Sequence, residues 1–291
     1  DQMDFVLWKP STAAHEPGWE SPCGYGRPGL HIECTAMINK HLGPTIDIHG
    51  GGHDLMFPHH ENEVAQGTCC HAEPQDYVRY WMHNGMINVN GEKMSKSLGN
   101  FVTVRELLGN FPGEQLRFAL LSAQYRSVLN WSEDLLTQGR QTLDRFYGAL
   151  RETANLADAV TLTPNEIQSS AVVKALCDDL NTPQAIAELH QLANQLYSAQ
   201  VDPNTKARVR AELVSTGQLM GLLNYAPERW FTDIASQNQA VDATAIEAKI
   251  SARAAAKKAK NFAQADAIRG ELDALGVEIQ DTREGTRWQW K

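Results

Sequence analysis

The residues with the clearest capacity for chemistry lie in the segment IDIHGGGHDLMFPHHENEVAQ, which runs from position 46 to 66. His59 and Glu63 are four residues apart, so on a helix they would share one face and could converge on one ion. Cys34 would arrive from the preceding helix. A thiolate, an imidazole and a carboxylate suit Zn²⁺, and three protein ligands leave a position open for a substrate or a further ligand. The alternative is a solvated His–Glu pair, with Cys34 as a small core residue.

The three glycines at 50–52 are a second candidate feature. They do not match the dinucleotide fingerprint G-x-G-x-x-G, so by themselves they indicate a phosphate or ribose site only weakly. Asp54 could accept a hydrogen bond from a ribose hydroxyl. The alternative is a tight turn that Asp54 caps.

A third feature is the string GEKMSKSLGN, from Gly91 to Asn100, which follows the strand-like segment MINVN. Lys93 and Lys96 would lie on a loop that glycines keep mobile, where their ammonium groups could neutralise the charge on a departing pyrophosphate. Such a loop could close for the chemical step and open to release product. The alternative is an exposed basic turn.

Basic and aromatic residues near the C-terminus form the fourth feature. Four of them recur at helical spacing and predict a basic stripe on one helix face: Lys249, Arg253, Lys257 and Lys260. A terminal hairpin would add Arg283, Arg287 and Lys291 around Trp288 and Trp290, a combination able to stack unpaired bases and hold a backbone. The alternative is a solvated helix face and a small hydrophobic hairpin core.

The elements that must position these residues follow from periodicity and breakers. Residues 10–29 are rich in Pro, Gly and Ser and predict a loop, followed by a helix over 31–41, the strand TIDIH, a glycine turn and a helix containing PHHENEVAQ. With the strands YVRYW and MINVN, this alternation predicts an α/β layer domain. From about 114 to 223 the pattern is helical, with a cap at Ser132 and breaks near Pro164, 181–183 and 202–204. It predicts a helical bundle, then a polar linker and a C-terminal unit of two helices and a hairpin.

Composition sets the limits on these interpretations. The chain has 291 residues, 42% of them hydrophobic, and no run of about 18 apolar residues, which argues for a soluble globular protein without a membrane partner. A net charge of −9 means that any nucleic-acid contact must come from a local basic patch. Five scattered cysteines favour reduced thiols and a cytoplasmic location. We expect a monomer.

The string KMSKS resembles the second signature of class I aminoacyl-tRNA synthetases. Together, GRPGLHIEC, HGGGHDLMFPHHENEVAQ, EKMSKSLGN and DDLNTPQA resemble cysteinyl-tRNA synthetases, in the family's order and across essentially the whole chain. The resemblance implies an α/β fold followed by an all-α region. In detail, it implies the second half of a Rossmann-type catalytic domain at 1–90, the KMSKS loop and a stem-contact region at 91–113, a tRNA-binding helical bundle at 114–225, a linker at 226–241 and an anticodon-binding α+β unit at 242–291.

Residue by residue, the resemblance implies one zinc ion bound by Cys34, His59 and Glu63, with the thiolate of the amino-acid substrate as a further ligand. It matches Lys96 to the family's ATP-contacting lysine and implies that Gly51 and Asp54 lie beside the adenosine. The implied reaction is attack of the L-cysteine carboxylate on the α-phosphate of Mg²⁺-bound ATP, then transfer of the acyl group to tRNA(Cys).

The sequence differs from the family pattern in two respects, and both change the function that we expect of this chain. The family begins with a half that carries a HIGH-type motif and a fourth zinc ligand, a cysteine; neither is found here, since HNGM at 83–86 lacks the second histidine. We therefore expect the C-terminal portion of an enzyme, incomplete as a catalyst alone. Leu30 and Cys23 stand where the family has Trp, so part of an aromatic pocket wall would be missing.

Two other functions remain open from the sequence. The first is a cysteine ligase that joins cysteine to a small amino sugar, although that reaction needs no basic C-terminal unit. The second is a non-catalytic zinc- and tRNA-binding module.

Overall fold

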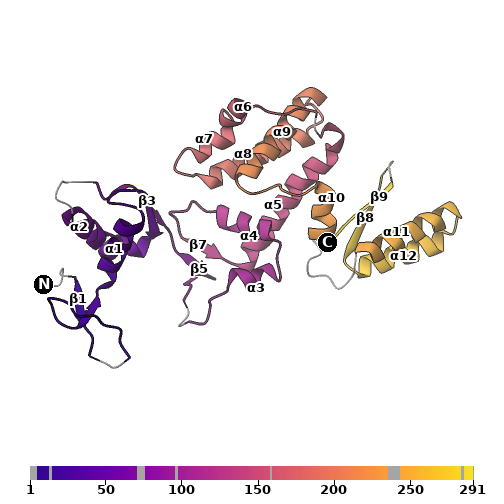
Figure 1. Ribbon diagram of the computed structural model, residues 1–291. Helices are drawn as coiled ribbons and strands as arrows, with labels where there is room; N and C mark the ends of the chain where they lie inside the picture. Colours follow the sequence, from indigo (N-terminus) through magenta and orange to yellow (C-terminus); the bar gives the residue numbers. More distant parts are fainter. Residues whose placement is uncertain are drawn as a thin grey trace. The chain divides into compact units, whose positions relative to one another are not determined.

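The computed structural model describes residues 5–12, 15–70, 76–95, 98–157, 159–234, 243–282 and 285–290 (Figure 1). The chain divides into two compact units, the first formed by residues 1–86 with 125–128 and the second by 87–124 with 129–291. Within the described residues, no helix is both long enough and apolar enough to cross a membrane.

The first unit combines two small sheets with two helices. Strands β1 (Trp8–Pro10) and β2 (Gly26–Pro28) are antiparallel, so the segment predicted as a loop contains one strand of a short ladder, and the other strand begins just before it. Helix α1 (Leu30–His41) follows, one residue from the predicted start. Strand β3 (Ile46–Gly52) pairs in parallel with β4 (Val78–Asn84), as expected of an α/β layer.

Between β3 and β4 lie the 3₁₀ turn η1 (His53–Leu55), the π-type turn η2 (Met56–His60) and helix α2 (Glu61–Cys69). The predicted glycine turn is wrong, because Gly50, Gly51 and Gly52 belong to β3 and continue its ladder with β4. A Cβ at Gly51 would lie 2.8 Å from Cε1 of His60, so the close approach of that ring explains the glycine.

The second unit begins with a three-stranded sheet in the order β6-β5-β7. Strand β5 (Ile87–Val89) pairs antiparallel with β6 (Glu92–Lys93) and parallel with β7 (Leu129–Trp131). Helices α3 (Val104–Leu108) and α4 (Gly113–Leu121) lie between β6 and β7. Strand β7 therefore interrupts the stretch that was predicted to be helical throughout, because its backbone completes the sheet beside β5.

The helical bundle follows the predicted breaks. Its helices are α5 (Glu133–Glu152), α6 (Pro164–Gln168), α7 (Ala171–Leu176), α8 (Thr182–Tyr197) and α9 (Pro203–Leu219), with the 3₁₀ turn η3 (Ala154–Leu156). The side chains of Ser132, Asn181 and Asp202 cap α5, α8 and α9 by accepting backbone N–H bonds. The largest apolar core of the described residues lies between these helices.

The remainder of the unit contains α10 (Pro227–Arg229), the turn η4 (Trp230–Ile234), α11 (Ala243–Lys258), α12 (Phe262–Ala274) and the hairpin β8 (Val277–Thr282) with β9 (Gly285–Trp290). The two helices and the hairpin confirm the predicted elements of the C-terminal unit. Residues 226–234 differ from the predicted polar linker, because they are helical and Trp230 is fully buried in the bundle core.

Candidate functional site

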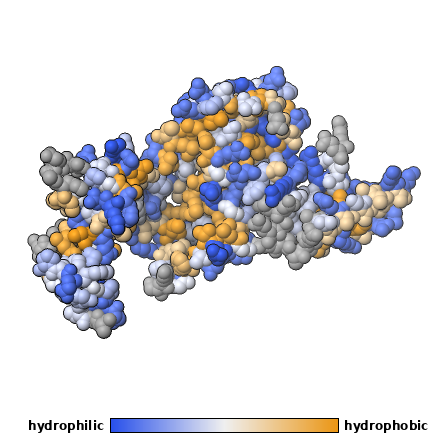
Figure 2. Space-filling view, viewed as in Figure 1, coloured by the Kyte–Doolittle hydropathy of each residue, from blue (hydrophilic) through white to orange (hydrophobic). Residues whose placement is uncertain are grey.

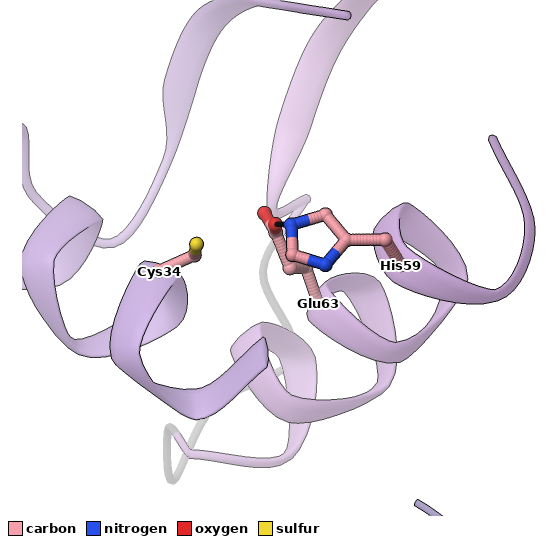
Figure 3. Close-up of side chains that lie close together, drawn as sticks. All are labelled: Cys34, His59 and Glu63. Carbon is pink, nitrogen blue, oxygen red and sulfur yellow. Dashed lines mark ion pairs between the residues drawn. The ribbon is translucent and has the colours of Figure 1, made fainter. Parts of the chain in front are cut away.

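Three side chains of the first unit converge as the sequence predicts. Cys34 comes from α1, His59 from the turn η2 and Glu63 from α2. The ligand atoms of the three all lie within 4.8 Å of one another. Figure 3 shows the His59 ring against the Glu63 carboxylate, with the Cys34 sulfur facing both from the neighbouring helix. The alternative of a solvated His–Glu pair is therefore wrong, since Glu63 is only 1% exposed.

The Glu63 carboxylate is held on both oxygens. Nε2 of His59 lies 2.6 Å from Oε1, while Nε2 of His49 lies 2.9 Å from Oε2. The Tyr77 hydroxyl donates to Oε2 at 3.5 Å, and burial together with the Glu63 charge raises the pKa of Tyr77 to about 12. A buried carboxylate needs such partners. His49 and Tyr77 thus orient Glu63 and leave Oε1 directed at His59 and Cys34.

The donor set fits a zinc ion. Tetrahedral zinc places nitrogen and oxygen ligands roughly 3.4 Å apart, so a cation would replace the 2.6 Å contact between His59 and Glu63 with two metal bonds. Burial, and then the neighbouring Glu63 carboxylate, raise the pKa of the Cys34 thiol. A divalent cation between the two would reverse that repulsion and favour the thiolate.

A group of histidines that the sequence reasoning missed lies beneath this site. Nδ1 of His60 is 2.7 Å from Nε2 of His83, and both rings lie against Trp81. Burial lowers the pKa of His60, and the adjacent His49 lowers it further. His49, His60 and Glu63 form a second set of groups close enough to hold an ion, but it shares Glu63 with the first. Trp81 and His83 are two positions apart in a strand, so their side chains share one face. That spacing is the feature of the sequence that could have predicted this group.

A cavity of about 830 Å³ opens beside the cluster. Its lining includes Phe5, Lys9, Leu30, His31, Phe57 and Asn62. The His31 ring packs edge to face on the His59 ring, with their centroids 4.8 Å apart, so the cavity begins one side chain away from the zinc-ligand set. Leu30, where the family carries Trp, is 62% exposed in this wall.

The residues predicted to bind the nucleotide are divided between the two units, in contrast to the three predicted zinc ligands, which all belong to the first. Asp54 is exposed on the turn η1, and a Cβ on Gly52 would lie 2.5 Å from its Oδ1. Lys93 is exposed in the two-residue strand β6, whereas it was predicted to lie on a loop. Asn100 steadies the flanks of the KMSKS string, since its Oδ1 accepts from the Ser95 backbone and its Nδ2 donates to the Lys93 carbonyl. Lys96 lies outside the described residues.

The predicted basic stripe on α11 is largely neutralised within its own domain. Arg253 is 4% exposed and makes a two-pronged contact with Asp281 at 2.9 and 3.0 Å. Lys257 also donates to Asp281, and Lys249 pairs with Glu271. Arg253 therefore holds the hairpin and is buried away from the stripe, whereas contact of the three lysines with tRNA stays a prediction. Lys260 is exposed beyond the end of α11.

The hairpin tryptophans are also placed differently from the prediction. Trp288 and Trp290 are 7% and 5% exposed and pack with Ile246, Leu272 and Val277. They form the hydrophobic core of the domain, which was the alternative interpretation, so their faces do not lie open to unpaired bases. Arg287 is half-buried, and Arg283 and Lys291 lie outside the described residues.

Three family models match the chain in succession. Residues 1–141 match the tRNA synthetases class I (C) catalytic domain, 171–224 the DALR domain, and 243–290 the cysteinyl-tRNA ligase anticodon binding domain.

Two curated relatives carry the name cysteine–tRNA ligase. The cysteine–tRNA ligase of Parvibaculum lavamentivorans is 52% identical over 99% of this chain and 60% of its own length. That of Saccharophagus degradans is 55% identical over 98% of this chain and 61% of its own length. The chain thus spans about three fifths of the length of the curated relatives it matches.

Among solved structures, the agnB2 LeuRS of Agrobacterium radiobacter K84, determined in a ternary complex with tRNA and LeuAMS, matches 69% of this chain and 31% of its own. The TM-score is 0.54 at 18% identity, which is a likeness of fold alone. With the three family models in order and identities of about half over nearly the whole chain, this chain belongs to the cysteinyl-tRNA synthetase family of class I aminoacyl-tRNA synthetases.

Proposed function

We propose that this chain serves the ATP-dependent joining of L-cysteine to tRNA(Cys), with its first unit selecting the amino acid at a zinc ion held by Cys34, His59 and Glu63. The convergence of these three ligand groups around a fully buried carboxylate carries the proposal. A bound zinc ion would supply an open position that a substrate thiolate fills well and the hydroxyl of serine fills poorly.

The surrounding side chains give this site its selectivity. His49 and Tyr77 fix the Glu63 carboxylate, so the ligand set is rigid before a substrate arrives. The adjoining cavity, which includes Leu30 and His31, would receive the rest of the amino acid. Because Leu30 is smaller than the family's Trp, we propose that discrimination depends mainly on the metal ligands and less on an aromatic wall.

The nucleotide would bind at the glycine strand and the KMSKS string. Gly51 and Asp54 would lie beside the adenosine of Mg²⁺-bound ATP. Attack of the cysteine carboxylate on the α-phosphate releases pyrophosphate, whose charge Lys93 and Lys96 would neutralise. The acyl group then passes to the 3′ end of the tRNA without a covalent enzyme intermediate, so positioning accounts for most of the rate.

The C-terminal domain would meet the tRNA. Support comes from the description of the family model that matches 243–290 and from the exposed ends of Lys249, Lys257 and Lys260. Their intramolecular partners, Glu271 and Asp281, are themselves half-exposed, so a phosphate could compete for these lysines. Arg253 is too buried for that role and would position Asp281.

The first experiment is the zinc content of the purified chain. We expect one equivalent in the unaltered protein and in the matched control Cys69→Ser, whose thiol is exposed on the same helix as Glu63. The double variant Cys34→Ser, Glu63→Gln should lose the metal. Zinc absent from the unaltered protein, or retained in the double variant, would contradict the site.

The second experiment is cysteine-dependent ATP–pyrophosphate exchange in a chimera that joins this chain to the part of a curated relative that it does not cover. Exchange that depends on Lys96, and falls in Lys96→Ala while tRNA binding persists, supports the ligase. If exchange never occurs although zinc and tRNA bind, the non-catalytic binding module becomes the better description.

A further inference from the structure

A polar cavity lies in the second unit, far along the chain from the zinc-ligand set. Its volume is about 440 Å³, and its walls come from the end of α5, the end of α8, η4 and the hairpin β8–β9, whose strands run beside α10 in Figure 1. A cavity of about 240 Å³ shares four of its lining residues, namely Arg151, Gln280, Arg287 and Gln289. Two guanidinium groups therefore line both hollows.

Arg151 is buried without full compensation of its charge. Its side chain is 13% exposed, and its guanidinium carbon lies 4.0 Å from the centre of the Phe231 ring. Nη2 donates to Oε1 of Gln289 at 3.0 Å. Nη1 is buried and has no hydrogen-bond partner among the described residues, since Oε2 of Glu228 is 3.9 Å away. Leaving a charged donor buried and unpaired is costly.

The charged groups around Arg151 act in opposite directions. Burial lowers the pKa of Arg151, Glu228 raises it, and the nearby Arg287 lowers it by less than Glu228 raises it. Asp144 also lines the cavity, but its Oδ1 already accepts from Arg140 and Trp230 at 2.7 Å each. Glu152 is exposed, and its charge raises the pKa of Arg151 less than the charge of Glu228 does. Nη1 of Arg151 is therefore a donor in this hollow that still lacks an acceptor among the described residues.

We propose that Arg151 and Arg287 form a binding site for a phosphate group, supplied by the backbone of the bound tRNA. A guanidinium presents parallel N–H donors that match two phosphate oxygens, which an ammonium group does not. A phosphate oxygen would give Nη1 of Arg151 its acceptor, and the amide of Gln280 would add a further donor.

The source of the phosphate follows from the walls of the cavity. Arg287 belongs to the segment that matches the anticodon-binding model. Arg151 lies in the last turn of α5, the first helix of the bundle. A backbone phosphate in this position would tie the two parts of the second unit together when tRNA binds. This step rests on the proposed function, whereas the phosphate site itself does not.

The test compares two variants with one control. Arg287→Gln and Arg151→Gln remove one guanidinium each, and Arg269→Gln removes an exposed arginine of α12 that lies outside the cavity. Binding of a tRNA(Cys) transcript is measured over a range of salt concentrations. We expect Arg287→Gln to weaken binding several-fold and to reduce the slope of log affinity against log salt by about one, with Arg269→Gln unchanged.

A second arm uses inorganic phosphate, with chloride at equal ionic strength, and follows thermal unfolding of the same proteins. Stabilisation that disappears in Arg287→Gln supports the site. If phosphate stabilises but the tRNA slope does not change, the site stands and the tRNA source is wrong. If neither measurement depends on Arg287 or Arg151, the site is overturned. If the unaltered chain binds no tRNA, the proposed function is refuted. The phosphate measurement alone then decides whether the cavity is an anion site.

Discussion

The two units of this molecule bury different kinds of side chain. In the described part of the first unit, the buried polar residues are Thr35, His60, Glu63, Gln66 and His83, and the buried hydrophobic residues are Ile46 and Tyr77. The three hydrophobic clusters of the described residues all lie in the second unit. The interior of the first unit is therefore mainly polar and contains the proposed zinc ligand Glu63, whereas the interior of the second unit is mainly apolar.

The first unit, whose interior is mainly polar, has apolar side chains exposed on its sheet. Ile48 and Tyr80 face each other across β3 and β4, and they are 63% and 68% exposed. Apolar side chains also lie exposed around α3 of the second unit, where Figure 2 shows hydrophobic colour, but there they surround a buried cluster. A polar interior supplies little hydrophobic stabilisation, so the first unit must depend on its hydrogen bonds and, if the proposed zinc ion binds, on that ion.

The largest effect should come from the apolar core of the bundle. Leu213 is fully buried in α9, and Leu213→Ala should lower the free energy of unfolding of the second unit by about 2–5 kcal/mol through lost burial and a cavity. Leu219→Ala, on the same helix at 60% exposure, is the matched control and should change little. Urea unfolding measures both, and equal losses would contradict the inference that the apolar interior stabilises the second unit.

The next effect should be confined to the first unit. Removing zinc with a chelator should destabilise α1 and α2 by about 3–4 kcal/mol if the ion is present at several hundred times its dissociation constant. Hydrogen exchange resolved by peptide should show the loss in these helices and not in α5, α8 or α9. Loss of protection in the bundle as well would mean that the two units do not differ in this way.

A smaller effect should follow from breaking the contact between α11 and the hairpin. Asp281→Asn weakens the charged hydrogen bonds from Arg253 and Lys257 and should cost about 1–2 kcal/mol, because Asp281 is 48% exposed and partly screened. Hydrogen exchange in β8 and β9 reports the loss.

The same pair has a defined pH dependence. Hydrogen bonds from Arg253 and then Lys257 hold the pKa of Asp281 well below its ordinary value of 3.8, so the contribution is present above that pH and disappears as the pH falls below it. Glu247→Gln, an exposed carboxylate on α11, is the control and should behave like the unaltered protein at every pH.

The smallest effect concerns Glu114, the one buried carboxylate among the described residues of the second unit. Glu114 is 5% exposed and accepts from Tyr147 at 2.9 Å and from the backbone of Leu223 at 2.7 Å, both on Oε1. Burial raises its pKa above the ordinary 4.5. The protonated form is therefore favoured on folding, and stability should fall as the pH rises from about 4.5 through the raised value.

Glu114→Gln tests this because its amide oxygen can keep both contacts of Oε1. The difference in unfolding free energy between the two proteins should change by at most about 1.4 kcal/mol per pH unit in this range. A difference that does not vary with pH would mean that Glu114 does not titrate in the folded protein.

Local signals accounted for the parts of the fold that depend on neighbours in sequence. The starts of α5, α8 and α9 coincide with the side-chain caps at Ser132, Asn181 and Asp202. Strand β7 was not foreseen, because its three residues are defined by pairing with β5, some forty positions earlier. The same limit applies to the glycines of β3, whose extended backbone is fixed by β4.

The sequence by itself determined which residues could hold a metal, since His59 and Glu63 are brought together by one helical turn and Cys34 stands in a recognisable motif. Only the tertiary structure decided that Glu63 is buried, that His49 and Tyr77 both contact its Oε2, and that Arg253 and Trp288 face inward. Helical spacing places side chains within a few residues by backbone geometry alone. Burial and charge pairing depend on which distant segments pack together, and that is settled only when the whole chain has folded.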